Sequence, residues 1–306
     1  MTHINDSILE TLAYFDVFNY PLTKGEIFLF LHKKYDHFTL ESGLQNLVLN
    51  KKIYRFNNFY TLINDPTLIK RREKGNDKAA HMLKIAKKIS HILIKFPYVR
   101  GIAVSGSLSK NFADEKSDID LFIITATDRL WIARTIMHLF KKLTFLVNKQ
   151  HFFCMNYYID EQQLEIVEKN IYTATEVVTL IPMEGDTVFE NFFAANNWTR
   201  NYLPNNILRL SSARQVKNSW FKMGIEFIFN NKIGNAIDNK LKEITQKRWQ
   251  KKTQQEKQNM HGVIMSMEAN KHFSKPDPSK YQNKLLTRYE DKVFRLLHEY
   301  ETSSAV

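Results

Sequence analysis

The stretch from Gly101 to Thr125, GIAVSGSLSKNFADEKSDIDLFIIT, constrains the fold of this 306-residue chain more than any other. A short apolar run ends at Gly106-Ser107, and a second apolar run follows a polar segment. This order predicts a strand, a glycine turn, a helix and a second strand. Asp118 and Asp120 are two residues apart, so on a strand their side chains lie on the same face.

Two carboxylates on one strand face repel each other and need a compensating cation or a network of hydrogen bonds. Mg²⁺ suits such a pair, because it binds one or two carboxylates together with phosphate oxygens and water. A glycine lets the backbone approach a phosphate closely, and the amide groups at the start of the following helix add hydrogen-bond donors. The stretch therefore combines the features of a phosphate site and a metal site.

These residues resemble the nucleotidyltransferase superfamily, whose best-known members are the polymerase-beta-like enzymes. The resemblance lies in the Gly-Ser turn followed by Asp-x-Asp between apolar residues. It implies an α/β (α+β) fold with a small mixed sheet as the nucleotidyltransferase core. It further implies that Gly106 and Ser107 bind the phosphates of a nucleoside triphosphate. Asp118 and Asp120 would be the catalytic metal ligands, with Mg²⁺ as the cofactor and Mn²⁺ as the alternative.

The family pattern is incomplete in the segment His151 to Ile159, which reads as the next strand. Members of the superfamily usually carry a third acid there, and this chain offers Asn156, which cannot accept a proton from an attacking hydroxyl. Asp160 or Glu176 would have to supply the missing carboxylate from elsewhere.

Two functions follow from this reading. The first is a Mg²⁺-dependent nucleotidyltransferase that moves a nucleoside monophosphate from a triphosphate to an acceptor hydroxyl or phosphate. The acceptor could be an RNA end, a protein side chain or a small sugar or antibiotic-like molecule, because the motif describes only the donor half of the reaction. The alternative is a catalytically degenerate nucleotide-binding protein whose flanking domains engage nucleic acid or a protein partner.

The net charge indicates the class of binding partner, and the cysteine content indicates the cellular compartment. A formal net charge of +12 favours polyanionic partners. The single cysteine, Cys154, cannot form an internal disulfide, which favours a reducing compartment such as the cytoplasm. Because Cys154 lies in an apolar run, we interpret it as a packing residue. No apolar run is long enough to span a bilayer, and the N-terminal residues do not resemble an export signal.

Residues 1–65 read as a winged-helix-like domain of three helices and a hairpin. Thr23 and Glu26 have the spacing of a capping box at the start of the second helix, and Asn57-Asn58 is the expected turn of the hairpin. Residues 1–62 hold six basic and six acidic side chains, so they lack the positive excess of a DNA-reading module. Docking or a structural role is the preferred interpretation.

The remaining boundaries follow composition. We interpret residues 66–97 as a basic linker helix, which Gly75-Asn76-Asp77 breaks into two pieces. Residues 98–205 form the predicted core, whose last part holds two helices separated by a break near Pro182. Residues 206–306 read as a helical, basic C-terminal region without strands, in which Lys275 to Pro278 form a loop. From residue 207 onward nineteen Lys and Arg stand against ten Asp and Glu. Such a face binds nucleic acid or anionic lipid, or is simply solvated.

Overall fold

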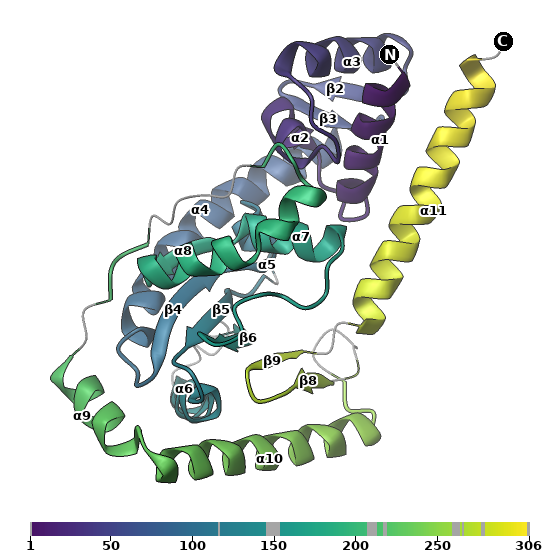
Figure 1. Cartoon of the computed structure of the whole chain (residues 1–306). Coiled ribbons are helices and arrows are strands. Elements are labelled where there is room, and N and C mark those ends of the chain that lie inside the picture. The colour runs from purple at the N-terminus through teal and green to yellow at the C-terminus, as the bar shows by residue number, and fades with distance from the viewer. Residues whose placement is uncertain are drawn as a thin grey trace.

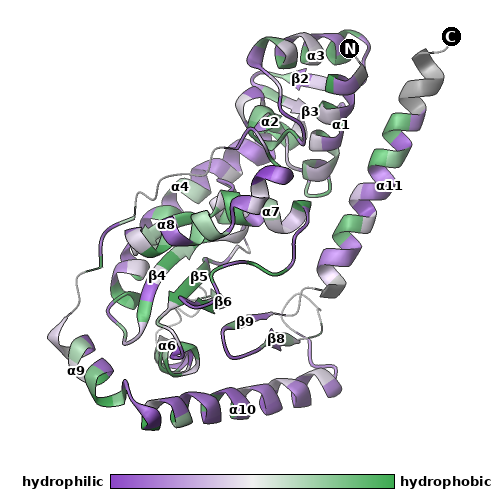
Figure 2. Cartoon of the chain, viewed as in Figure 1, coloured by the Kyte–Doolittle hydropathy of each residue, from purple (hydrophilic) through white to green (hydrophobic). Residues whose placement is uncertain are grey.

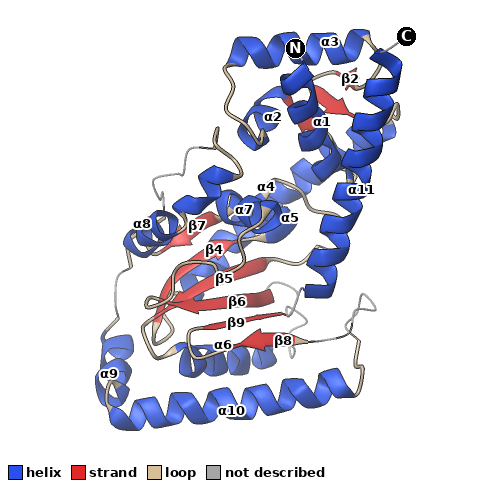
Figure 3. Ribbon diagram, turned by 45° about the vertical axis from the view of Figure 1, so that its right-hand side comes forward, coloured by secondary structure: helices blue, strands red, loops and turns tan. Residues whose placement is uncertain are grey.

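A six-stranded mixed sheet forms the centre of the computed structural model, which describes residues 2–115, 117–144, 154–206, 213–216, 219–258, 264, 266–276 and 279–304. The strand order is β7-β4-β5-β6-β9-β8, and the strands lie side by side in Figure 3. The strands are β4 (Val99–Val104), β5 (Asp120–Thr125), β6 (Cys154–Asp160), β7 (Ile181–Glu184), β8 (Met267–Ala269) and β9 (Phe273–Pro276). The expected mixed α/β fold is thereby confirmed.

Only the pair β5 and β6 is parallel, and the other neighbouring strands are antiparallel. A parallel pair needs a crossover connection. Helix α6 (Leu130–Thr144) lies in that connection. This arrangement places the start of β5 beside the start of β6, with Asp120 opposite Cys154 and Thr125 opposite Asp160.

Helices cover both faces of the sheet (Figure 1). Alternate residues of β5 point to opposite faces, so Leu121 and Ile123 pack on α4 (Thr67–Leu93) and α6. Phe122 and Ile124 pack on the other side, where the cover is made by helices α7 (Ile171–Thr179) and α8 (Asp186–Ala195). Asp120 has the same parity as Phe122 and therefore faces the α7 side.

The first 61 residues fold as three helices and a small three-stranded sheet of order β1-β3-β2. These elements are α1 (Thr2–Asp16), β1 (Leu22–Thr23), α2 (Lys24–Phe30), α3 (His37–Leu49), β2 (Tyr54–Phe56) and β3 (Phe59–Thr61). The capping box between Thr23 and Glu26 is present, and β2 and β3 form the expected antiparallel hairpin. The resemblance to a winged helix stays a prediction.

Helix α4 runs without a break, so the predicted interruption at Gly75-Asn76-Asp77 is wrong. Gly75 serves packing instead. A Cβ at this position would lie 2.3 Å from the ring of Phe112, and the Gly75 carbonyl oxygen accepts a hydrogen bond from Ala113 at 3.1 Å. The glycine lets the loop after the core's first strand lie directly on the helix.

Two strand predictions also need correction. The expected break between two helices near Pro182 lies between α7 and α8, but the segment within it forms the edge strand β7, which pairs with β4. Strands β8 and β9 interrupt the C-terminal region that we expected to hold no strand, and Lys275 and Pro276 belong to β9 rather than to a loop. Strand β9 gains its partner, β6, more than a hundred residues away in sequence, which local periodicity cannot report.

The other C-terminal elements are helical. They are α9 (Trp220–Phe229), α10 (Lys232–Gln254) and α11 (Ser279–Ser304). Helix α10 is predominantly hydrophilic in Figure 2 and rests on α6, where Ile237 and Leu241 touch the core. Helix α11 packs along α1, with Leu285 buried in the N-terminal core and Lys292 paired with Asp16. Among the described residues, no helix combines the length and the apolar character needed to cross a membrane.

Candidate active site

The predicted glycine turn lies directly against one of the predicted acids. Gly106 has φ +69°, and a Cβ there would come within 2.7 Å of Oδ2 of Asp120. The amide of Ser105 donates to the carbonyl oxygen of Asp120 at 3.0 Å, which fastens the end of β4 to the start of β5. A glycine is required here both for the left-handed backbone and for the space that the carboxylate occupies.

The helix after this turn, α5 (Gly106–Ser109), has only four residues. The expectation that a helix start would supply donors and positive potential is therefore wrong in part, because so short a helix carries little dipole. Positive charge comes instead from Lys110, whose Nζ donates to the carbonyl oxygen of Gly106 at 3.2 Å. Ser109 closes the turn from the other side, with Oγ donating to the same oxygen at 2.9 Å.

Asp120 has an altered acidity. Burial is the main cause that raises the pKa of its carboxyl group to about 6, and a hydrogen bond from Cys154 partly offsets this effect. The negative charges of Asp118 and Glu176 raise the pKa further. Three acidic groups thus act on one another at the end of this strand, which is the electrostatic situation that a bound cation relieves.

A cavity of about 220 Å³ opens beside Asp120 on the α7 side of the sheet. Its polar lining includes Gly106, Asp120, Glu168, Glu176 and Lys275, and its wall also includes the rings of Phe122 and Tyr157. Lys275 is buried and pairs with Glu168 and, at 3.0 Å, with Glu268. Local sequence patterns did not indicate either residue here: Lys275 reaches the cavity through the pairing of β9 with β6, and Glu168 lies in the loop between β6 and α7.

Of the two acids proposed to replace the missing third carboxylate, Asp160 lies at the wrong end of the sheet. It is opposite Thr125, five residues along β5 from Asp120, and this separation corresponds to about 16 Å at 3.3 Å per residue. Glu176 lies on the cavity wall with Asp120. It is held by Lys110, with 2.7 Å between Nζ and Oε1. The side chain of Asn156 lies outside the described residues.

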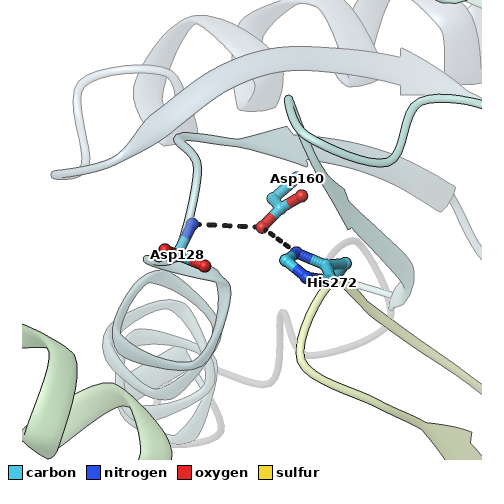
Figure 4. A group of neighbouring side chains, drawn as sticks. All are labelled: Asp128, Asp160 and His272. Carbon is cyan, nitrogen blue, oxygen red and sulfur yellow. Dashed lines mark hydrogen bonds and ion pairs between the residues drawn. The ribbon is translucent and has the colours of Figure 1, made fainter.

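Asp160 belongs to a separate cluster with Asp128 and His272, whose potential metal-binding atoms all lie within 4.8 Å of one another (Figure 4). Oδ2 of Asp160 accepts a hydrogen bond from the amide of Asp128 at 3.1 Å and lies 2.9 Å from Nδ1 of His272. Its Oδ1 accepts from the amide of Gln162 at 3.0 Å. Lys271 already pairs with Asp128 at 2.6 Å.

This cluster joins the turn between β8 and β9 to the end of β6 and the start of α6. These hydrogen bonds and the ion pair with Lys271 tie the three elements together. Within the described part of the chain, Asp118 and Asp120 belong to no such group of three ligands.

Cys154 contacts a proposed site residue, which its apolar neighbours in the sequence did not indicate. We predicted that it packs in the core, whereas it pairs with Asp120 across β5 and β6, is half-buried and hydrogen-bonds to the Asp120 carboxylate. The register of the parallel pair decides this contact, and register depends on the whole sheet.

Comparison with known proteins identifies the class. Residues 85–196, from within α4 to the residue after α8, match the family model described as a nucleotidyltransferase domain. No curated protein and no solved structure matched the chain. The chain therefore contains a nucleotidyltransferase domain, and the general chemistry that this domain supports is the transfer of a nucleotidyl group. The predicted superfamily is confirmed for this segment, and the elements outside it have no assigned relative.

Proposed function

We propose that the protein is a Mg²⁺-dependent nucleotidyltransferase that transfers a nucleoside monophosphate from a triphosphate to an acceptor hydroxyl or phosphate. The observation that carries this proposal is the contact between the Gly106 turn and the Asp120 carboxylate. At this contact, the backbone of a glycine turn that could bind phosphate lies next to the partly buried carboxylic acid of Asp120. The family match over the same elements supports it.

In this proposal Gly106 and Ser107 bind the triphosphate, and Asp118 and Asp120 hold Mg²⁺, with Mn²⁺ as a substitute. The mutual repulsion of the acids and the raised pKa of Asp120 fit a cation. When bound, the metal neutralises phosphate charge and activates the α-phosphate toward displacement of pyrophosphate. Lys110 adds a positive charge beside the turn. We place the reaction in the cytoplasm, because a lone cysteine suits a reducing compartment.

For the proton acceptor, Glu176 replaces Asp160, since Glu176 lines the cavity and its charge acts on Asp120. Its ion pair with Lys110 would have to open for this role. The binding of phosphate by Lys110 is the event that would release it.

The alternative is a nucleotide-binding protein that does not turn its nucleotide over. It is favoured because, among the described residues, Asp118 and Asp120 belong to no group of three potential metal ligands whose atoms all lie within 4.8 Å of one another. The structure does not favour a polynucleotide acceptor that binds to the basic side chains of α10. This helix rests on α6, on the face of the sheet opposite the cavity, so its basic side chains do not line the site.

The test is calorimetric binding of the four ribonucleoside triphosphates with and without Mg²⁺. We expect Mg²⁺-dependent binding by the wild type and none by the double variant Asp118→Ala/Asp120→Ala. Asp114→Ala, which removes an exposed carboxylate of the same loop, is the matched control and should bind normally. Equal binding by the double variant would refute the proposed site. Release of pyrophosphate upon addition of acceptors then separates the enzyme from the alternative.

A further inference from the structure

A second cavity, also of about 220 Å³, borders the same turn at Ser107 rather than at Asp120. The two cavities share Gly106, Tyr172 and Glu176, so a ligand bound at the turn can extend into either. The second cavity is lined mainly by aromatic rings.

Four parts of the chain supply these rings. Tyr14 comes from α1 and Phe18 from the turn after it, Phe112 follows α5, Tyr172 lies at the start of α7 and Tyr281 belongs to α11. Helices α1 and α11 lie outside the segment that matches the nucleotidyltransferase domain. The N-terminal and C-terminal parts of this chain therefore complete a wall of this cavity.

The hydroxyl group of Tyr14 is the unusual feature of this wall. Tyr14 is 2% exposed, and its Oη makes no hydrogen bond of good geometry among the described residues, although the side chain of Thr175 lies close enough to lower its pKa. The nearby hydroxyl of Thr175 donates instead to the carbonyl oxygen of Ile171 at 2.8 Å. A buried hydroxyl without a partner is costly, and one on a cavity wall can be satisfied by a ligand.

The other polar groups of the wall gather around this hydroxyl. Burial is the main cause that raises the pKa of both Tyr14 and Tyr172, and the charge of Glu176 raises it further in each case. Glu176 is neutralised by its ion pair with Lys110. Without phosphate, the charges of Lys110 and Glu176 in this lining are paired with each other, and the rest of the wall offers mainly ring faces and hydroxyl groups.

We propose that this cavity binds a nucleobase, stacked on the tyrosine rings and hydrogen-bonded through one polar edge to the hydroxyl of Tyr14. A nucleobase is a flat uncharged ring with a polar edge, which matches both kinds of lining. The inference rests on the proposed function, because the turn at Ser107 would hold the attached phosphates. The base belongs either to the donor triphosphate or to a nucleotide acceptor, and the experiment distinguishes these sources.

The test uses Tyr14→Phe, which removes only the hydroxyl, and Tyr281→Ala, which removes a ring that is 51% exposed. Tyr281→Phe restores the ring, and Phe38→Ala removes an 82% exposed ring that does not line this cavity. Calorimetry in the presence of Mg²⁺ measures binding of nucleoside triphosphates, nucleoside monophosphates and inorganic tripolyphosphate to the full chain. Thermal melting shows whether each variant folds. Tyr14→Phe should melt no lower than the wild type, because it deletes a hydroxyl that has no partner.

We expect Tyr14→Phe and Tyr281→Ala to weaken nucleotide binding by about tenfold each, while tripolyphosphate binding is unchanged. Tyr281→Phe and Phe38→Ala should bind like the wild type. A loss with triphosphates assigns the cavity to the donor base, and a loss confined to monophosphates assigns it to a nucleotide acceptor. If all variants bind every nucleotide equally, the inference is wrong and the proposed function stands. If the wild type binds neither tripolyphosphate nor any nucleotide, the proposed function fails and the inference fails with it.

Discussion

At the Gly106 turn, two constraints apply to one residue. The backbone has a positive φ of +69°, and the space that a side chain would fill holds the carboxylate of Asp120. The first constraint costs a non-glycine residue about 1–2 kcal/mol. The second acts on the site itself, because any side chain must displace one of the proposed metal ligands.

We predict that Gly106→Ala destabilises the fold by about 1–3 kcal/mol and abolishes Mg²⁺-dependent triphosphate binding. The added methyl group both strains the turn and moves the Asp120 carboxylate. Urea unfolding and calorimetry measure the two effects. Gly25→Ala is the control, since Gly25 lies in helix α2 with no atom within 4 Å of its would-be Cβ. It should be neutral or slightly stabilising. Normal triphosphate binding by Gly106→Ala would show that the turn does not hold the phosphates.

At the scale of secondary-structure elements, contacts between helices and loops that are distant in sequence position the site. Helix α4 supports the loop after the turn through Gly75, and α10 supports the start of α6 through Asp238. Oδ1 of Asp238 accepts the amide hydrogen bond of Ile132 at 2.8 Å, so a residue of one helix caps another. The Asp238 contact lies away from both cavities, whereas Phe112, the ring against Gly75, also lines the second cavity.

Gly75→Ala should destabilise the protein by about 1–2 kcal/mol. The gain of about 1 kcal/mol in helix propensity is outweighed by the clash of the new methyl group with the Phe112 ring. Urea unfolding measures the difference. In a Phe112→Leu background the penalty should shrink or change sign, because the smaller side chain makes room. An equal penalty in both backgrounds would mean that the ring is not the cause.

Asp238 gives the protein a specific dependence on pH. Burial is the main cause that raises the pKa of its carboxyl group to about 6. The folded state therefore holds this proton more tightly than the unfolded chain. The stability that protonation adds is fully present below about pH 4 and is lost as the pH rises through about 6.

We expect the stability of the wild type relative to Asp238→Asn to fall between pH 4 and pH 7 by up to about 3 kcal/mol. Asparagine keeps an oxygen for the Ile132 amide and does not titrate. The measurement is the free energy of unfolding in urea for both proteins at several pH values, and the difference cancels groups that titrate in both. A difference that does not change with pH would contradict the raised pKa.

At the scale of the whole molecule, Arg72 joins the N-terminal unit to the core. It is 2% exposed and pairs with Glu26 of α2 at 2.5 Å. Its other nitrogens donate to the carbonyl oxygens of Pro21 and Asn111 at 3.3 and 3.1 Å. The guanidinium also lies 3.9 Å from the centre of the Tyr20 ring, which borders the second cavity.

Arg72→Met should destabilise the protein by about 3–5 kcal/mol, since it leaves Glu26 and two carbonyl oxygens without their partner. Urea unfolding is the measurement. Lys74→Met, on the same helix, is the matched control. It removes an ion pair with Glu115 in which both side chains are about four-fifths exposed, and it should change stability by less than about 1 kcal/mol. Similar effects of the two substitutions would show that Arg72 does not hold the two parts together.

Features encoded by neighbouring residues could be predicted from the sequence. The capping box at Thr23, the hairpin at Asn57 and the glycine turn followed by Asp118-x-Asp120 all depend on spacings of a few residues. The expected glycine and Asp120 lie together, whereas Asp118 precedes β5, which starts at Asp120, and so does not share a strand face with it as predicted. Local geometry fixes such features, because only a few backbone conformations satisfy them.

Only the tertiary structure decided which distant residues share the site. The parallel register of β5 and β6 moved Asp160 to the far end of the sheet and brought Cys154 to Asp120. The pairing of β9 with β6 delivered Lys275, and the packing of α1 and α11 delivered Tyr14 and Tyr281. These outcomes depend on which strands pair and in which register, and on which distant surface a helix covers. A local pattern shows that a face is buried but not what it packs against.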